Sequence, residues 1–507
     1  MYLGVDVGTS VTKAAVFSET GELRAVETRP THLDSPAEGW FEQDPEAVLG
    51  SVAAVVRSVV AQTGPPAVIG LTGQGDGVWL TDETGHAVRP AISWMDGRAV
   101  DILRRWVAQD VVEKAYRHTG NTIFPGSAAP VLAWLAEHEP ASLERATTAG
   151  YCKDVVMQRL TGVRATDASD ASLPFLDPGS RTYDHDVLTW CGLSEWAHLL
   201  PPIASPLPTG ELTAEAAVLL GLPAGTPVTA GPFDLPACAL GSGVRRPGEG
   251  HVIVGTTLAC QVMVDSVDTA GEAAGMTLAA FDGGAQPLAP LLGPGGPAML
   301  TRDRPATETP GRWLRAMPAM VGTAAIDWVL DLIGQSHEAL DGLLTASPPG
   351  SHGVTCLPYF SPAGERAPFL EPRARAGFDR LTVQTSKADL VRAACEAVGY
   401  AARHCFDVAG LEGDVAMCGG GTRSATWLRI FADVLGRPVR LARQPETGAR
   451  GAVLAALQAL GRDVDIEAWT ASEGVIEPGP DAAYYAEGYA GYRARVDAAR
   501  ATWREHE

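Results

Sequence analysis

The hydrophobic and polar positions of the chain follow two spacings, one typical of β-strands and the other of amphipathic helices. The chain opens with an apolar run, Tyr2–Val7, which is followed by a polar tight turn and a second apolar run. This pattern predicts a β-hairpin. Asp44 and Pro45 then precede apolar residues at helical spacing over 48–59, so we expect a core helix there.

Much of the remaining chain combines short apolar strands, which end in polar or glycine-rich tips, with helices. The predicted strands are residues 67–71, 226–230, 250–254 and 414–418. The predicted helices are residues 131–137, 153–160, 213–220, 386–408 and 427–435. Ser386 and Asp389 have the spacing of a capping box at the start of the longest helix. Strands and helices that alternate in this way predict an α/β fold.

Length and a weak internal repetition divide the chain into two predicted domains. At 507 residues, 46% of them hydrophobic, the chain is too long for one core and apolar enough to bury two. The run 250–254 ends in Gly255-Thr256 and repeats in weak form the first strand, which ends in Gly8-Thr9. We expect an N-terminal domain over residues 1–243 and a C-terminal domain over residues 244–507.

Charge and cysteine usage exclude several classes of partner. The net charge of −21 and the lack of a basic stripe argue against nucleic acid. Arg57 interrupts the longest apolar candidate, so we expect no membrane span. The chain begins directly with a strand and its eight cysteines have no CxxC spacing, which together predict a cytoplasmic protein with reduced thiols. A homodimer remains open.

Asp234 is the candidate catalytic base. It follows the predicted strand 226–230 and precedes small apolar residues that lead to Gly241 and Gly243, so the strand delivers one carboxylate to the mouth of a sheet. The alternative for a single Asp at such a turn is a helix N-cap, a position that Asp often occupies.

The first tight turn carries residue types that bind phosphate. Gly8 permits close approach of the backbone to a ligand, and Thr9 and Ser10 offer hydroxyl and N–H donors to phosphate oxygens. Asp6, just before the turn, is able to hold Mg²⁺ through water. The alternative is an ordinary hairpin turn.

A second polar group is a candidate substrate site. Gln74 and Asp76 lie in the glycine-rich tip that follows the strand 67–71, and Trp94, Asp96 and Arg98 end another short run. A buried Trp is usually part of a core. Beside these polar groups, however, its ring is able to cover the C–H face of a polyol while its neighbours bind hydroxyls.

Three further segments leave alternatives open. The polar stretch 165–172 is typical either of a helix cap or of a cleft lining. The low-complexity stretch 282–299 predicts a loop or a mobile flap. Three glycines at 419–421, between a strand and a helix, permit close approach of a flat ring or a phosphate to the backbone.

Taken together, these motifs resemble the FGGY family of carbohydrate kinases over essentially the whole chain. The matching segments are Gly4-x-Asp6-x-Gly8-Thr9-Ser10-x-x-Lys13, Glu42-Gln-Asp-Pro45, Trp94-x-Asp96-x-Arg98, Ala230-Gly231-x-x-Asp234, Gly255-Thr256, Gly364-Glu365-Arg366-x-Pro368, Gly419-Gly420-Gly421-x-x-Ser424 and Glu446-Thr-Gly448. The resemblance implies two duplicated ribonuclease-H-like domains, of the actin and hexokinase type, around a central cleft.

The resemblance also implies ATP and Mg²⁺ as cofactors and assigns roles to residues. Asp6 and Asp234 are expected near the metal. The residues expected to bind the nucleotide are Gly8, Thr9, Ser10, Lys13, Gly255, Thr256, Gly420, Gly421 and Ser424. The residues expected to bind the substrate are Gln74, Asp76, Trp94, Asp96, Arg98 and Asp234.

The substrate is expected to be a neutral sugar or polyol, because three acids against one Arg would repel an anion. Leu235 and Val131 depart from the pattern of many relatives and put D-xylulose and glycerol in doubt. The segment 73–77, with Thr166-Asp167-x-Ser169, is more similar to the erythritol and L-xylulose kinase branch. Two alternatives are an actin- or Hsp70-like ATPase, which should lack the substrate residues, and a silent sugar sensor, which should lack Asp6 or Asp234.

Overall fold

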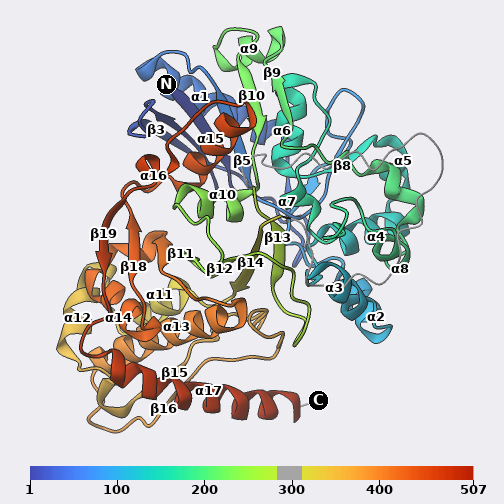
Figure 1. Cartoon of the computed structure of the whole chain (residues 1–507). Coiled ribbons are helices and arrows are strands. Elements are labelled where there is room, and N and C mark those ends of the chain that lie inside the picture. The colour runs from blue at the N-terminus through green and yellow to red at the C-terminus, as the bar shows by residue number, and fades with distance from the viewer. Residues whose placement is uncertain (282–310, 506–507) are drawn as a thin grey trace. The chain divides into compact units, whose positions relative to one another are not determined.

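The structure is a computed structural model that describes residues 1–281 and 311–505. Its contacts divide the chain into two compact units, whose elements are labelled in Figure 1. Unit 1 comprises residues 1–243, 265–314 and 446–470, and unit 2 comprises residues 244–264, 315–445 and 471–507. The chain therefore leaves unit 1 after Gly243 and returns to it twice.

Unit 1 is built on a six-stranded mixed sheet in the order β3-β2-β1-β5-β10-β9. Strands β1, β5 and β10 run parallel, whereas β2, β3 and β9 are antiparallel to their neighbours. The strands of this sheet are β1 Tyr2–Val7, β2 Val11–Phe17, β3 Leu23–Pro30, β5 Ile69–Gly73, β9 Thr209–Glu211 and β10 Pro227–Ala230. The short strands of unit 1 are β4 Glu42–Gln43, β6 Trp79–Thr81, β7 Ala91–Ile92, β8 Thr148–Gly150 and β13 Met276–Ala279.

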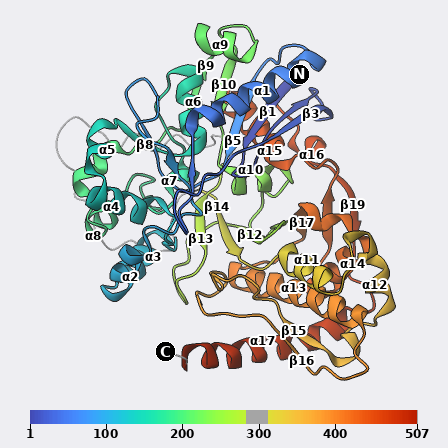
Figure 2. The same cartoon turned by 180° about the vertical axis from the view of Figure 1, so that it is seen from behind.

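Helices cover both faces of this sheet (Figures 1 and 2). The helices of unit 1 are α1 Pro45–Thr63, α2 Val100–Ala108, α3 Val111–Thr119, α4 Ala128–His138, α5 Pro140–Arg145, α6 Cys152–Thr161, α7 Ala168–Ala171, α8 His185–Trp190, α9 Ala214–Leu220, α10 Asp234–Gly241, α15 Thr447–Ala459 and α16 Ile466–Trp469, with a 3₁₀ turn η1 at Ser194–Leu199. Leu3, Val5 and Val7 pack in one core with α1 and α6. Because side chains alternate along a strand, Gly4 and Asp6 face the other side, where α15 lies.

Helix α15 packs directly against the backbone of β1, β5 and α10. A Cβ atom on Gly4 of β1 would be 2.2 Å from the carbonyl oxygen of Ala449, and one on Gly70 of β5 would be 2.4 Å from that of Ala452. A Cβ atom on Gly451 would be 1.9 Å from the carbonyl oxygen of Ala237 in α10. Only glycine permits such contacts, so these positions fix how α10 and α15 lie against the sheet.

Unit 2 repeats this topology. Its strands follow the order β14-β12-β11-β17-β18-β19, with β11, β17 and β18 parallel and β12 and β19 antiparallel to their neighbours. The strands of unit 2 are β11 Gly250–Val254, β12 Leu258–Val264, β14 Trp313–Ala319, β15 Thr355–Leu357, β16 Gly377–Asp379, β17 Val415–Cys418, β18 Val439–Ala442 and β19 Ser472–Ile476. The helices are α11 Thr323–Leu332, α12 Leu340–Ala346, α13 Lys387–Ala409, α14 Ala425–Leu435 and α17 Ala482–Glu505, with 3₁₀ turns η2 His337–Ala339, η3 Ser351–Gly353 and η4 Gly420–Arg423.

Several expectations for individual elements are confirmed. The predicted duplicated α/β fold is present, the Asp44 side chain caps α1, and Ser386 and Asp389 form the capping box of α13. The polar stretch 165–172 holds the short helix α7, which Asp167 caps, so its helix-cap interpretation is confirmed, and a cleft lining stays a prediction. The stretch 282–299 lies outside the described residues.

The cysteines and the apolar helix can be compared directly with the sequence predictions. All eight cysteines are free thiols, and seven are buried. Within residues 1–281 and 311–505, one helix, α1, has the length and apolar composition of a membrane span. Val48, Val52 and Val56 of this helix pack in the core of unit 1, and a core helix of this length has the same composition.

Candidate active site

Two carboxylates, Asp6 and Asp234, lie close enough in unit 1 for Asp6 to affect the ionisation of Asp234. Asp6 is on β1, and Asp234 is the first residue of α10. Burial, and then the negative charge of Asp6, raise the pKa of Asp234 to about 7. Burial also raises the pKa of Asp6 to about 6, with Lys13 opposing the shift and Glu446 adding to it. Both groups therefore titrate within the physiological range.

The backbone that carries Asp234 is fixed at three consecutive residues. The N–H of Gly231 donates to the carbonyl oxygen of Leu71 at 2.7 Å. The hydroxyl of Thr72 donates to the carbonyl oxygen of Pro232 at 2.7 Å, and the N–H of Phe233 donates to Oγ of Ser169 at 3.1 Å. Phe233 takes the N-cap position of α10, so the interpretation of Asp234 as the helix cap is wrong.

Lys13 lies opposite Asp6 in the β1–β2 register and forms an ion pair with Glu446, Nζ to Oε2 3.1 Å. Burial lowers the pKa of Lys13, but Glu446 and Asp6 outweigh this effect and raise it. Glu446 immediately precedes α15, and a Cβ atom on Gly448 would be 2.7 Å from Oδ2 of Asp6. The start of α15 thus lies against Asp6. The motif Glu446-Thr-Gly448 signalled this segment, but no role for Glu446 was predicted from it.

The side chain of Thr9 is held in a hydrogen-bond network. Its hydroxyl donates to Oε1 of Gln74 at 2.9 Å and accepts from Nε1 of Trp94 at 2.8 Å. Gln43 connects Gln74 with the backbone of Thr9, because it accepts from Nε2 of Gln74 at 2.8 Å and donates to the carbonyl oxygen of Thr9 at 3.1 Å. The single hydroxyl proton of Thr9 is used here, which leaves only its backbone N–H for a phosphate. Gln43 was missed, although it lies in the segment Glu42–Pro45.

Asp96 and Arg98 are joined in a buried ion pair. Nε and Nη2 of Arg98 donate to the two carboxylate oxygens of Asp96, each at 2.9 Å, and Nη2 also donates to Glu42 at 2.8 Å. Neither side chain has exposed surface, and the guanidinium lies 4.1 Å from the ring centre of Trp40. Direct contact of both residues with substrate stays a prediction, and the pair also supports the loop that carries Trp94, since Asp96 accepts from the N–H of Arg98 at 2.8 Å.

The other predicted substrate residues differ in exposure. Gln74 and Asp76 are buried, and a carboxylate oxygen of Asp76 accepts from the N–H of Ala128 at the start of α4, at 3.4 Å. Trp94 and Asp234 are each half-buried. Of the predicted substrate group, Trp94 and Asp234 therefore offer the most surface to a ligand.

The turn Gly255–Thr257 of unit 2 joins β11 to β12 and is anchored to the start of α11. The N–H of Thr323 donates to the carbonyl oxygen of Gly255 at 2.8 Å. A Cβ atom on Gly322 would be 2.4 Å from the carbonyl oxygen of Thr256, so glycine is required for this approach. The side chain of Thr256 is exposed.

The glycine cluster at 419–421 follows β17 and contains both closely packed and exposed residues. A Cβ atom on Gly421 would be 2.3 Å from Cγ1 of Val254, whereas Gly420 has open space around its α-carbon. Ser424 caps α14 by accepting from the N–H of Trp427, and its hydroxyl donates to Asp341 at 2.9 Å. Gly419 and Gly420 are exposed, whereas Gly421 and Ser424 are buried and shape the turn.

Two models of one protein family match the chain. The family model described as the FGGY family of carbohydrate kinases, N-terminal domain, matches residues 1–241, and the C-terminal domain model of the same family matches residues 293–460.

Three similar proteins span most of the chain. An erythritol kinase of Brucella abortus (strain 2308) is 31% identical over 525 residues, which cover 97% of this chain and 95% of the relative. A xylulose kinase of Escherichia coli (strain K12) is 31% identical and covers 86% of this chain and 85% of the relative. The solved structure of a xylulose kinase from Rhodospirillum rubrum matches with a TM-score of 0.83 and 29% identity, covering 99% of both chains.

Proposed function

Because the chain belongs to the FGGY family of carbohydrate kinases, we propose that it transfers the terminal phosphoryl group of ATP to a hydroxyl of a neutral sugar or polyol, with Asp234 as general base. Kinase activity on a small sugar or polyol follows from the family, as does ATP as the donor. The identity of the base and the charge of the substrate are the specific parts of the proposal.

The single observation that carries the base assignment is the environment of Asp234. A base works best when its pKa lies near the working pH, and burial beside Asp6 raises the pKa of Asp234 to about 7. Its backbone is fixed at Gly231, Pro232 and Phe233, which limits the movement of the carboxylate. Positioning of this kind is the main demand that phosphoryl transfer makes on a protein. We expect kcat/KM to fall as the pH drops below about 7, because the base becomes protonated.

The donor set also fits a magnesium ion. Mg²⁺ prefers oxygen ligands, and the carboxylates of Asp6 and Asp234 lie in surroundings that raise both pKa values. We propose that these two residues hold the ion, which when bound supplies positive charge against phosphate oxygens. Lys13, on the strand beside Asp6, is proposed to add a second positive charge for the phosphates.

The proposed nucleotide contacts are mainly backbone groups. In unit 1 they are the N–H groups of Thr9 and Ser10, because the Thr9 hydroxyl is already bonded and the N–H of Gly8 donates to the carbonyl oxygen of Val11 at 3.1 Å. In unit 2 they are the turn at Gly255 and Thr256 and the exposed backbone of Gly420. N–H groups in glycine-containing turns are common phosphate ligands.

The proposal of a neutral substrate rests on how the cations of unit 1 are engaged. Arg98 is paired with Asp96 and Glu42, and Lys13 is paired with Glu446. An anionic substrate would therefore add like charge beside Asp76 and Asp234. We propose a straight-chain polyol or ketose of about four to six carbons whose carbon face lies on the ring of Trp94.

A substrate panel tests this part. The purified protein is assayed for ADP release with ATP, Mg²⁺ and polyols or ketoses of three to seven carbons, each paired with the corresponding aldonic acid. Turnover of at least one neutral compound, well above that of its acid, is expected. Faster phosphorylation of the acids would overturn the neutral-substrate proposal while leaving the kinase activity intact.

Asp234→Asn tests the base. The substitution preserves size and should keep the fold and most of the substrate affinity, but should lower kcat by roughly 10²–10⁴, the usual contribution of a positioned general base. Asp101→Asn is the matched control, because the Asp101 side chain is 84% exposed, on α2. A kcat within threefold of the parent enzyme would remove Asp234 from this role.

A further inference from the structure

Lys153, near the start of α6, is fully buried and surrounded by three carboxylates. Its Nζ lies 2.7 Å from Oδ1 of Asp154, 2.8 Å from Oδ1 of Asp167 and 2.8 Å from Oδ2 of Asp170. All four side chains are at most 4% exposed. These four residues are called the Lys153 cluster below.

The Lys153 cluster fixes the short helix α7 to α6. Asp167 caps α7 by accepting from the N–H of Ser169 at 2.8 Å, and Asp170 lies within the helix. Beside them, the hydroxyl of Tyr151 donates to the carbonyl oxygen of Leu173 at 3.0 Å. Both ends of α7 are therefore tied to the start of α6.

The charge balance makes Lys153 the residue on which this attachment depends. Three carboxylates against one ammonium leave excess negative charge in a buried site, and burial with neighbouring carboxylates raises the pKa of Asp170 well above its ordinary value. Removing the lysine from such a group would leave buried charges without a partner, which costs far more than breaking an exposed ion pair. The helix α7 is thus held in one position.

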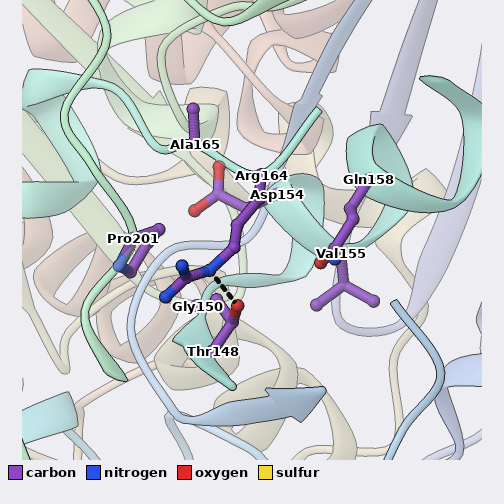
Figure 3. Close-up of a pocket in the computed structure, with 8 residues that line it drawn as sticks. All are labelled: Thr148, Gly150, Asp154, Val155, Gln158, Arg164, Ala165 and Pro201. Atoms are coloured by element: carbon purple, nitrogen blue, oxygen red, sulfur yellow. Dashed lines mark hydrogen bonds between the residues drawn. The ribbon is translucent and has the colours of Figure 1, made fainter. Parts of the chain in front are cut away.

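The space beside the cluster is too small for a ligand. Asp154 borders a cavity of about 10 Å³, and Figure 3 shows Arg164 directed toward Thr148 across it, with a hydrogen bond of 2.5 Å. A cavity of this size holds about one water molecule. The cavity beside Asp154 therefore has room for water but not for a sugar or a nucleotide.

The side chain of Ser169 connects α7 with the backbone next to the proposed base. The hydroxyl oxygen of Ser169, on α7, accepts the N–H of Phe233 at 3.1 Å, and Phe233 directly precedes Asp234. Ser169 is 1% exposed, so no solvent would replace the bond if it were lost. We propose that Ser169 is a positioning residue for Asp234 and that the Lys153 cluster holds it in place. The inference rests on the proposed role of Asp234 as base.

Ser169→Ala tests the inference, with Ser172→Ala as the matched control. Ser172 lies just after α7, is equally buried, and its hydroxyl also accepts a backbone N–H, that of Ala279 at 3.1 Å. Ser169→Ala should lower kcat about tenfold or more, because small displacements of a catalytic group are costly, with the KM of the sugar changed less than twofold. Ser172→Ala should change kcat less than twofold. Equal losses in both variants would overturn the inference.

A double-mutant cycle separates positioning from general destabilisation. If Ser169 acts through the Asp234 carboxylate, Ser169→Ala should have no further effect on kcat in the Asp234→Asn background, measured with radiolabelled ATP. Additive losses would contradict the inference. The failures are distinguishable: full activity in Asp234→Asn alone overturns the base, whereas an inactive Asp234→Asn with a harmless Ser169→Ala overturns only the positioning role.

Discussion

At the scale of single residues, the placement of Asp6 and Asp234 lowers the stability of the folded protein. Each carboxylate is placed where burial and a neighbouring acid disfavour its ionised form. The same surroundings that bring the pKa of Asp234 to about 7 make the charged side chain unfavourable in the folded protein. Catalytic preparation at this position therefore opposes stability.

This cost predicts a pH-dependent gain in stability for Asp234→Asn. The folded pKa of about 7 lies above the ordinary value of 3.8, so the favourable contribution of the protonated group is complete below pH 3.8 and is lost as the pH rises through 7. With ligands and metal removed by EDTA, the variant should melt a few degrees above the parent at pH 8, and less than half as far above it at pH 5. Calorimetry of both proteins and of Asp101→Asn checks this; an equal shift at both pH values would contradict it.

Lys13→Met should weaken ATP binding. Its ammonium is proposed to face the phosphates, and a hydrogen bond to a charged group contributes about 1.5–3 kcal/mol, so the KM for ATP should rise about tenfold or more while the KM for the sugar changes little. Lys114→Met, at an exposed position of α3, is the control. An unchanged KM for ATP would mean that Lys13 serves only to pair with Glu446.

The sequence suggests roles for single residues, but it does not predict which residues they contact. Asp6, Asp234 and the turn Gly8–Ser10 were selected because acids and small hydroxyl residues at strand ends suit metal and phosphate binding. The bond that occupies the Thr9 hydroxyl comes from Gln74, 65 residues away. Asp96 and Arg98 were assigned to substrate since their mutual pairing depends on side-chain direction, which residue types alone do not give.

The close contact between α10 and α15 in unit 1 could not be predicted from the sequences of the two helices. Both helices are rich in alanine and glycine, and they approach so closely that a Cβ atom on Gly241 would be 1.9 Å from the carbonyl oxygen of Thr447. Capping residues in the sequence correctly predicted where α1 and α13 begin. The motif residues from Glu446 to Ala452 gave no such signal, because two glycines in the first turns are poor helix formers.

Gly451→Ala should destabilise the protein strongly. The added methyl group would lie 1.9 Å from the carbonyl oxygen of Ala237, and overpacking of this kind typically costs about 1–3 kcal/mol or more. The control is Gly50→Ala in α1, which meets nothing within 4 Å and should stabilise by roughly 0.5–1 kcal/mol. Urea unfolding of both variants measures the difference; a neutral Gly451→Ala would show that α10 and α15 separate readily.

At the scale of the whole molecule, the two units are not consecutive halves of the chain, because each unit is built from three separate segments. The restart of the pattern near residue 250 indicated a duplicated architecture, and the topology of the two sheets repeats. The return of residues 446–470 to unit 1 depends on tertiary packing, which no local pattern records.

A fragment of residues 1–243 should not fold cooperatively. It contains the sheet of unit 1 but lacks α15, so Gly4, Gly70 and Gly241 would lose the backbone that covers them. The same fragment with residues 446–470 attached through a flexible linker should gain a cooperative thermal transition, detectable by circular dichroism. Cooperative unfolding of the shorter fragment would show that α15 adds little.

The late position of α15 also bears on how the protein is made. A ribosome completes the six-stranded sheet of unit 1 within the first 243 residues, yet the helix that covers one face begins only at Thr447 of the 507-residue chain. At about 5–20 residues per second, the intervening synthesis of roughly 200 residues lasts about 10–40 s. Throughout that interval the nascent sheet has an uncovered face, which makes it a target for chaperones and gives translation speed an influence on the yield of folded enzyme.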